Sequence, residues 1–297
     1  MKELIIKYSS KELEQKIIEI ISFIKKKVRQ DKVVIAISGG LDSDVVARLT
    51  AKAIDKSRIK LFIVIQREME EVHISNAREL ASDLGITLHE IFLEDLPYNL
   101  IHAIGEADPI EEFNSNGLLD PSRAKCSIRT SILSTYQDRG YIVIGTSNRT
   151  EYETGFFLPF GDGVAHLKPI VHLYKTQVRQ IAEYIGTNEK VIKQPASAGF
   201  WEGQTDLEDL AYWIYNEGPI KKQRIFNTED DQNVLKIKNK LKIEYIDIAL
   251  LAISKKCKDE DVCKYSKLPL NIVMKLRKLT VEAKRFKHRK LNEQIRY

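Results

Sequence analysis

The sequence predicts an α/β fold with a doubly wound parallel sheet, followed by a helical C-terminal region. Four short segments that predict strands alternate with stretches of helical periodicity, and the first of them, VVIAI at residues 33–37, is a continuous apolar run rich in β-branched residues. Continuous apolar runs of this kind are typical of strands that are buried on both faces, as in parallel sheets. The last 79 residues, beyond Gly218, contain no glycine, which is a composition that suits helices.

The first predicted element is an amphipathic helix over residues 10–30. It begins with a serine, and its apolar residues recur at helical spacing: Leu13, Ile17, Ile20, Ile21 and Ile24. The run VVIAI at residues 33–37 predicts the first strand. A helix is expected to start near Asp44, because apolar side chains again fall on one face.

The alternation of strands and helices then continues along the chain. The predicted elements are strand 59–65, a helix around 72–84, strand 86–92, a helix around 123–138, strand 141–145 and a helix over 173–186. Residues 106–125 are polar and contain two prolines, so we expect a loop there. Such an order is typical of a Rossmann-like sheet.

Length and composition predict a soluble protein with a sizeable core. The chain has 297 residues, of which 43% are hydrophobic, and it lacks an apolar run of the roughly 20 residues that a membrane helix needs. Its N-terminus carries charges where a signal peptide is apolar. We therefore expect a cytoplasmic location and no membrane contact. Cys126, Cys257 and Cys263 are interpreted as reduced thiols.

Charge is distributed unevenly along the chain. Residues 220–297 hold 21 Lys and Arg against 10 Asp and Glu, whereas the whole chain has a net charge of +5. A basic segment can contact nucleic acid, but it can also be the solvated surface of helices. We favour the second interpretation, because no aromatic or RNA-module motif is interleaved with these charges. The chain is accordingly divided into residues 1–30, 31–218 and 219–297.

A candidate phosphate-binding loop lies between the first strand and its helix. It reads Ser38-Gly39-Gly40-Leu41-Asp42-Ser43. Two glycines let backbone N–H groups approach an anion, and the helix start adds positive potential. The lysine of a Walker loop is absent, while Ser38 and Ser43 offer hydroxyl groups to phosphate. Because bare phosphate would repel Asp42, its presence indicates a bridging Mg²⁺ ion.

These residues resemble the loop of the PP-loop ATP pyrophosphatases, which have an adenine nucleotide alpha hydrolase-like fold. Members of that superfamily grip ATP by its β and γ phosphates while a substrate oxygen attacks the α-phosphate. The resemblance implies that pyrophosphate leaves and an adenylated substrate remains. It does not define the substrate, because members make amides, argininosuccinate, GMP or modified tRNA bases.

Further motifs narrow the resemblance. They are Gly145-Thr146-Ser147-Asn148-Arg149-Thr150-Glu151, Lys168-Pro169-Ile170, Leu173-Tyr174-Lys175-Thr176-Gln177-Val178, and the segment from Pro195 to Asp206. In this order the motifs look like those of the ammonia-dependent NAD synthetases, from the phosphate loop to about residue 210. The segment from Pro195 to Asp206 is similar to that family's mobile loop, which excludes water from the acyl adenylate when it closes.

Several residues of these motifs are candidates for catalysis and ATP binding. Glu151 follows the end of a strand, where α/β folds bind ligands, and with Asp42 it is a candidate Mg²⁺ ligand. Lys175 lies in the first turn of its helix, where a cation opposes the helix dipole, which favours a role in contacting phosphate. The resemblance implies that Thr146 lies against adenosine and that Ser197 also contacts ATP.

The acid-binding side of the resemblance is less complete. The resemblance implies a substrate site at Arg129, Phe160, Asp162, His166 and Lys168. The family usually has arginine, lysine and aspartate at the positions of Ser127, Pro159 and His166. These departures leave open a divergent NAD synthetase or a paralogue that amidates another acid, such as a sugar acid.

The expected activity is ATP-dependent amidation of deamido-NAD by ammonia, with ATP and Mg²⁺ required. Residues 1–30 cannot house a glutaminase domain, so free ammonia or a separate protein supplies the nitrogen. A tRNA-modifying PP-loop enzyme is a weaker alternative, since the later motifs point elsewhere. A homodimer is expected, because the family builds its dinucleotide site across a two-fold interface and the helix over residues 10–30 has an apolar stripe to bury.

Overall fold

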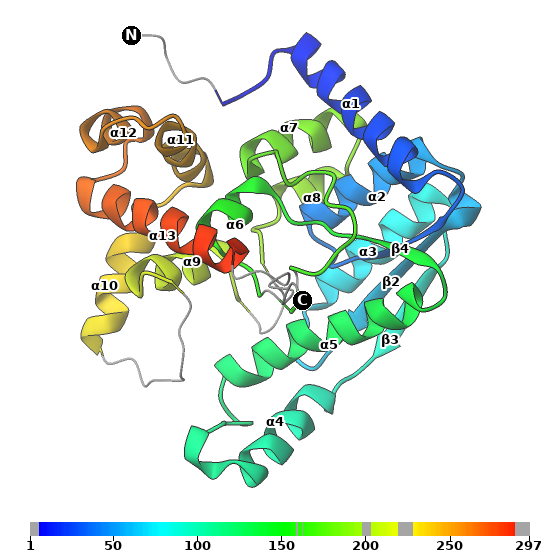
Figure 1. The fold of residues 1–297 in the computed structure, drawn as a ribbon, viewed down its shortest axis with the longest axis horizontal. Helices are drawn as coiled ribbons and strands as arrows, with labels where there is room; N and C mark the ends of the chain where they lie inside the picture. Colours follow the sequence, from blue (N-terminus) through cyan, green and yellow to red (C-terminus); the bar gives the residue numbers. More distant parts are fainter. Residues whose placement is uncertain (1–5, 159, 162, 198–202, 219–227, 289–297) are drawn as a thin grey trace, which may run out of the picture.

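The computed structural model describes residues 6–158, 160–161, 163–197, 203–218 and 228–288, and within them a four-stranded parallel sheet forms the centre of the fold (Figure 1). Its strands are β1 (Lys32–Ala36), β2 (Ile59–Ile65), β3 (Leu88–Phe92) and β4 (Tyr141–Ile144), in the order β3-β2-β1-β4. Val33 of β1 pairs with Ile59 on one side and Ile142 on the other. The predicted doubly wound parallel sheet is confirmed.

Helices cover both faces of the sheet. One apolar core joins β1 and β2 to α1 (Ser10–Val28), α2 (Leu41–Ala53), α3 (Glu71–Leu84) and α7 (Lys175–Ile185). The opposite face packs against α5 (Leu119–Gln137). Because side chains alternate along a strand, Val33 and Ile35 enter the first core and Val34 enters the second.

Helix α1 packs inside its own chain. The side chains of its apolar stripe are buried in the core with α2: Leu13, Ile17, Ile20, Ile24 and Val28. The capping box that Ser9 and Glu12 form fixes the start of this helix. The stripe is therefore already covered, and it gives no reason to expect a dimer.

The prediction of a loop over residues 106–125 is wrong in part. Helix α4 (Leu96–Ala107) and a 3₁₀ turn (Pro109–Glu111) occupy its first residues, and α5 begins at Leu119 rather than near residue 123. Pro109 and Pro121 lie in first turns, where a missing N–H costs no helical hydrogen bond, so here the prolines mark helix starts. Helix α2 likewise begins directly after Gly40, before the predicted start near Asp44.

The chain beyond Gly218 is helical where the structure describes it, as predicted. The helices that follow α7 are α8 (Glu189–Lys193), α9 (Asp206–Tyr215), α10 (Thr228–Lys238), α11 (Ile243–Ser254), α12 (Asp259–Ser266) and α13 (Leu270–His288). Helices α9 to α13 share a second apolar core, which also takes in Tyr174 at the start of α7. Figure 1 shows this group, hereafter the C-terminal helical group, beside the short helix α6 (Arg149–Thr154). The division of the chain at residues 30 and 218 stays a prediction. No helix among the described residues is long and apolar enough to cross a membrane.

Candidate active site

The loop between β1 and α2 has a backbone that only glycine allows at one position. Gly39 has φ +73°, and a Cβ atom there would lie 2.0 Å from the backbone oxygen of His73 on α3. Asn76 of the same helix donates its side-chain N–H to the Gly39 carbonyl at 3.1 Å. Gly40 is the N-cap of α2 and has no side chain to cap that helix. Gly40 therefore leaves the first N–H groups of α2 uncapped, an arrangement that suits an anion, and the binding of phosphate by this loop stays a prediction.

The two serines of the loop bind one another. Ser38 Oγ lies 3.1 Å from Ser43 Oγ, and Ser43 Oγ donates to the Gly40 carbonyl at 3.0 Å. Ser38 and Gly40 line the cavity described next, whereas Ser43 is buried behind the loop. In this structure the Ser43 hydroxyl shapes the loop from within, and its predicted contact with phosphate stays a prediction.

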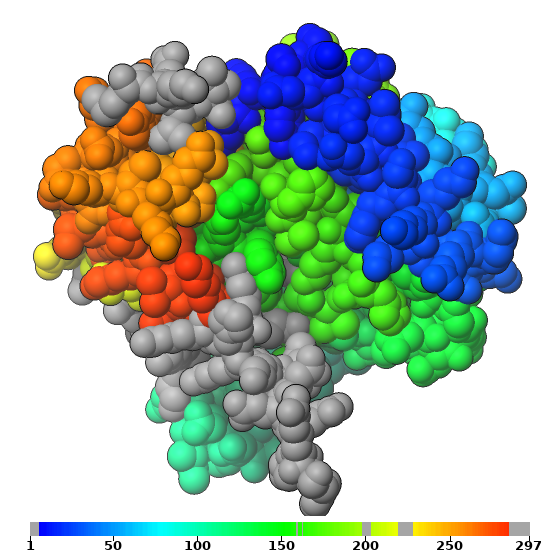
Figure 2. Space-filling view, turned by 45° about the horizontal axis from the view of Figure 1, so that its top comes forward, coloured from blue at the N-terminus to red at the C-terminus, as the bar shows by residue number. Residues whose placement is uncertain are grey.

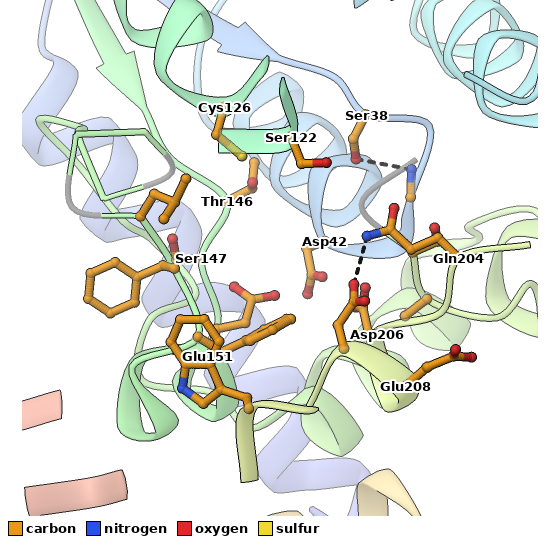
Figure 3. Close-up of a pocket in the computed structure, with 18 of the residues that line it drawn as sticks. Ser38, Asp42, Ser122, Cys126, Thr146, Ser147, Glu151, Gln204, Asp206 and Glu208 are labelled. Atoms are coloured by element: carbon orange, nitrogen blue, oxygen red, sulfur yellow. Dashed lines mark hydrogen bonds between the residues drawn. The ribbon is translucent and has the colours of Figure 1, made fainter. Parts of the chain in front are cut away.

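A cavity of about 570 Å³ opens at the carboxyl ends of β1 and β4 (Figure 3). This volume lies in the range of sites for cofactors and other small molecules. The cavity brings together most of the predicted ATP and catalytic residues: Ser38, Gly40, Asp42, Thr146, Glu151, Lys175 and Ser197. Residues that are more than 150 positions apart in the chain meet here, because parallel strands end at one edge of the sheet.

Charged side chains converge at the floor of the cavity. The Lys175 ammonium donates a hydrogen bond to Asp42 Oδ2. Asn148 Nδ2 donates to Asp42 Oδ1 at 3.3 Å and to Glu151 Oε1 at 2.8 Å, so a single amide bridges the two carboxylates. Asp206, the first residue of α9, also interacts electrostatically with Lys175. Figure 3 shows Asp42, Glu151 and Asp206 around one space.

This arrangement keeps Lys175 charged. Burial alone lowers the pKa of an ammonium group, but the carboxylates of Asp42, Asp206 and Glu151 outweigh it and raise the pKa of Lys175 above its usual value. A fixed positive charge in a buried site is suited to stabilising negative charge on a bound phosphate.

The ionised forms of Glu151 and Asp206 are destabilised in this site. Burial raises the pKa of Glu151 well above its usual value, and the neighbouring Asp42 raises it further against the opposing effect of Lys175. Burial also raises the pKa of Asp206. A bound cation would stabilise these buried carboxylates, because it offsets both their burial and their mutual repulsion. The site is therefore suited to bind a cation.

The described residues fit a Mg²⁺ ion that is shared with a phosphate chain. No group of three or more His, Cys, Asp or Glu side chains among them is arranged to hold a metal by itself. Mg²⁺ commonly binds through one or two carboxylates and takes its other ligands from substrate phosphates and water. Asp42 and Glu151, bridged by Asn148 beside the phosphate loop, provide such a pair.

Aromatic side chains form one wall of the cavity. Phe156 and Trp213 meet edge to face with ring centroids 5.3 Å apart. Trp213 Nε1 donates to the Thr154 carbonyl at 3.2 Å, which fixes the indole against α6. Phe157 and Tyr212 also line the cavity. This wall is suited to hold a planar ring and to keep water out.

Acidic residues of α9 line a second side. Gln204 Nε2 donates to Asp209 Oδ2 at 2.7 Å, and Glu208 lies at the same rim. Burial raises the pKa of Asp209 to about 7, although the hydrogen bond from Gln204 opposes the shift. Asp206 N donates to the Ala196 carbonyl at 2.7 Å, which ties the start of α9 to the segment from Pro195.

Two arginine side chains of helix α5 line the cavity, and one of them is a residue that we expected to bind the acid substrate. Arg129, a predicted substrate residue, lines the cavity together with Arg123 and Cys126. Ser127 is exposed and is absent from the lining, because it points to another side of the helix. The structure thus brings Arg123 to the cavity, and the departure at Ser127 lies outside it.

The other predicted acid-binding residues that the structure describes, Phe160, His166 and Lys168, do not line this cavity. Phe160 is 67% exposed, and its carbonyl accepts a hydrogen bond from Thr130 Oγ1. His166 is exposed, and its Nδ1 accepts from Val143 N at 2.9 Å. Lys168 Nζ donates to the Gly163 carbonyl at 2.7 Å. Pro159 and Asp162 lie outside the described residues.

Sequence reasoning missed several residues of the site. Asp206 stands at the end of a motif that the resemblance had singled out, so the motif itself was a signal. Asn148 had a local signal as well, because Asn148 and Glu151 have the spacing of a capping box. Arg123 and Trp213 had none, since only the packing of α5 and α9 turns them toward the cavity.

Comparison with known sequences gives a consistent family. The model of the family described as NAD synthase matches residues 15–217. A protein of Pyrococcus horikoshii named NH(3)-dependent NAD(+) synthetase is 38% identical over 202 residues, which cover 66% of this chain and 72% of the relative. A protein of the same name from Thermococcus sibiricus is 34% identical over 203 residues, which cover 65% and 74%.

Solved structures share the fold. The NMN synthetase of Francisella tularensis is 26% identical with a TM-score of 0.59, and the match covers 78% of this chain and 94% of that one. The NH3-dependent NAD synthetase of Campylobacter jejuni matches 91% of this chain and 93% of its own with a TM-score of 0.63, at 21% identity.

Proposed function

Because the chain belongs to the NAD synthase family, we propose that it uses ATP to adenylate the nicotinate carboxylate of deamido-NAD and then amidates it with ammonia. It is an enzyme of the ammonia-dependent NAD synthase type, a carbon–nitrogen ligase. The observation that carries the proposed chemistry is the convergence of Asp42, Glu151 and Lys175 beside the phosphate loop.

The chain first binds and orients the triphosphate. The N–H groups at the start of α2 face the cavity at Gly40 and can hold the β and γ phosphates. Thr146, which follows β4 and lines the cavity, would lie against the adenosine. Mg²⁺ held by Asp42 and Glu151 would neutralise charge on the triphosphate. The α-phosphate is then presented to the acid.

The acid carboxylate next attacks the α-phosphate. The new P–O bond forms as the bond to pyrophosphate breaks, and pyrophosphate takes the electron pair. Lys175 is placed to stabilise the negative charge on the α-phosphate oxygens, because its own carboxylate partners keep it protonated. The product is an acyl adenylate, in which AMP is a far better leaving group than oxide.

Ammonia then attacks the acyl carbon and expels AMP. The surroundings must exclude water, which would hydrolyse the adenylate. The aromatic wall of Phe156, Phe157 and Trp213 supports this requirement, since it makes one side of the cavity apolar. Asp209, with its raised pKa, is available near neutral pH to take a proton from ammonium or from the attacking nitrogen.

A second candidate acid is the mononucleotide form of the substrate. The relative from Francisella tularensis is an NMN synthetase, and its product is the amide of a nicotinate mononucleotide. Arg123 and Arg129 line the same single-chain cavity as the ATP residues, where a terminal phosphate of such an acid would find cations. Deamido-NAD remains our first choice, because the closer curated relatives carry the NAD synthetase name.

We also propose a homodimer that is formed by helices α4 and α5. Exposed apolar residues gather along these helices and the turn between them: Leu96, Leu100, Ile110, Phe113 and Leu118. We call this set the α4–α5 surface. Leu118 also lines the cavity, so the surface is continuous with the site. Phe160 and His166, which are exposed and lie outside their own chain's cavity, are then available to a partner's site.

The test of the function compares acids. Purified protein with ATP, Mg²⁺ and ammonium should release pyrophosphate when deamido-NAD is added, with turnover of about 1 s⁻¹ or more, which is ordinary for an enzyme. Nicotinate mononucleotide and a sugar acid are run in parallel. Faster turnover of the mononucleotide would select the second candidate. If neither deamido-NAD nor nicotinate mononucleotide causes release of pyrophosphate, both candidate substrates are refuted.

A further inference from the structure

The N-terminus of α7, the helix that begins with Lys175, contacts a carboxylate of the C-terminal helical group. Asp247 lies on α11 and is fully buried. Its Oδ2 accepts hydrogen bonds from Thr176 N at 2.8 Å and from Thr176 Oγ1 at 2.6 Å. Since Thr176 is the second residue of α7, Asp247 caps the N-terminus of the helix whose first residue is Lys175.

The other oxygen of Asp247 reaches α6. Thr150 Oγ1 donates to Asp247 Oδ1 at 2.5 Å and accepts a hydrogen bond from Lys175 N at 3.0 Å. Thr150 directly precedes Glu151 in the chain. One buried carboxylate therefore binds both Thr176, the residue after Lys175, and Thr150, which precedes Glu151 and accepts the hydrogen bond from Lys175 N.

Helix α6 is too short to hold itself in place. It has six residues, and isolated helices of that length are unstable. A second C-terminal helix fixes its other end, because a Cβ atom at Gly155 would lie 3.1 Å from Ala283 Cβ of α13. Figure 2 shows the green residues around α6 and α7 between α1 in blue and the C-terminal helices in orange and red.

We infer that Asp247 is a positioning residue for the adenylation step, through which the C-terminal helical group sets the placement of Lys175 relative to Glu151 and Asp42. The hydrogen bonds of Asp247 support the positioning itself, and the expected effect on kcat rests on the proposed function. Asp247 lies outside residues 15–217, which the family model matches. Burial raises the pKa of Asp247 to about 6, although hydrogen bonds from Thr150 and Thr176 oppose this shift. The carboxyl group is therefore ionised at pH 7.5.

The consequence concerns kcat rather than ATP binding. The triphosphate is expected to bind mainly to N–H groups of the phosphate loop, which Asp247 does not touch. Lys175 acts on charge that develops during the reaction, and a misplaced charge costs transition-state stabilisation. Loss of Asp247 should therefore lower kcat and leave the KM for ATP nearly unchanged.

The experiment uses Asp247→Ala, Asp247→Asn and a control, Leu250→Ala. Leu250 is fully buried on the same helix and belongs to the apolar core, so its truncation destabilises α11 without removing the carboxylate. Each full-length variant is assayed 10 °C below its own Tm by release of pyrophosphate with deamido-NAD. We expect Asp247→Ala to lower kcat at least about tenfold with the KM for ATP within about threefold.

The other two variants separate positioning from stability. Asp247→Asn keeps an accepting oxygen and should lose about threefold or more in kcat, whereas Leu250→Ala should stay within about twofold. Equal kcat losses in Leu250→Ala and in the Asp247 variants would overturn the inference. So would a raised KM for ATP with unchanged kcat. If Asp247→Ala does not fold, the comparison of kcat between Asp247→Asn and Leu250→Ala decides the inference by itself.

A second readout does not depend on the substrate. If the parent turns over none of the acids, the proposed function fails, and amide hydrogen exchange of Lys175 and Thr176 then decides the inference. We expect these amides to exchange at least about tenfold faster in Asp247→Asn, relative to amides of α2 in the same molecule. Leu250→Ala should show no such local change. Unchanged exchange in Asp247→Asn would overturn the inference.

Discussion

The carboxylate of Asp42 accepts a hydrogen bond from the Lys175 ammonium, although 133 residues separate the two in the chain. Asp42 is the second residue of α2, where the phosphate loop leads into that helix, and Lys175 is the first residue of α7. Glu151 and Asp206 surround the pair with further negative charge. Among the residues that the structure describes, the floor of the cavity holds one cation, Lys175, among three carboxylates, and this imbalance is the basis of the first two predictions.

The carboxylates of Asp42 and Glu151 are expected to be essential for turnover. Asp42→Asn and Glu151→Gln should each lower kcat at least about tenfold, because each removes a charged oxygen that we propose as a ligand for Mg²⁺. Glutamine can still complete the capping box with Asn148, so Glu151→Gln should keep α6 folded. Glu153→Gln, on the same helix but outside the cavity, is the control and should stay within about twofold. Unchanged activity in both site variants would refute the metal assignment.

Lys175 is expected to act on the reaction more than on binding. Lys175→Gln should lower kcat about a hundredfold or more, because it removes the positive charge that we propose Lys175 presents to the α-phosphate. Steady-state kinetics with varied ATP measures this, with circular dichroism to verify folding. Lys190→Gln, which removes a surface ion pair with Glu79, should leave kcat unchanged. A loss confined to the KM for ATP would contradict the proposed role of Lys175.

The α4–α5 surface is expected to mediate dimerisation. Ile110, which is 82% exposed, should lie in the interface, so Ile110→Lys should shift sedimentation from dimer to monomer at micromolar concentration. Ile18→Lys on α1 replaces another exposed apolar residue and should leave the dimer intact. A parent protein that sediments as a monomer with full activity would refute the dimer.

Asp209 gives a testable dependence of stability on pH. Its pKa is raised to about 7 in the folded protein, against about 3.9 in an unfolded chain. The folded state therefore binds this proton more tightly, so the contribution of Asp209 to stability is present below about pH 4 and is lost as the pH rises to about 7. Asp209→Asn should be more stable than the parent at pH 8, by roughly 1–2 kcal/mol, and no more stable at pH 4.

Urea denaturation of both proteins at the two pH values measures this difference. Glu208→Gln on the neighbouring residue is the control and removes a surface ion pair with Lys238. Equal stability differences at pH 4 and pH 8 would contradict the raised pKa of Asp209.

Arg123 is expected to contribute to acid binding. Arg123→Gln should raise the KM for the acid about tenfold, the loss expected for one charged hydrogen bond, with the KM for ATP little changed. Ser127→Ala on the same helix points away from the cavity and should alter neither constant. An effect of Ser127→Ala as large as that of Arg123→Gln would show that the acid lies elsewhere.

Local patterns in the sequence predicted the sheet and the phosphate loop. Apolar runs between helical stretches predicted β1, β2 and β4, because a strand buried on both faces needs continuous apolar residues. The run of β3 is interrupted by His89 and Glu90, and none of its residues is fully buried. Prolines misled the prediction over residues 106–125, since proline both interrupts helices and starts them, and the choice depends on position within the turn.

What the sequence determined by itself is the chemistry that short motifs encode: glycines for close approach of an anion, and Asp42, Glu151 and Lys175 as groups suited to ATP and Mg²⁺. What only the tertiary structure decided is which distant residues share the cavity and what holds them. Arg123 turns toward the cavity because α5 packs on the sheet, and the α1 stripe is buried within the chain. Asp247 has no local motif, because its partners on α6 and α7 come near it only when the C-terminal helical group has packed.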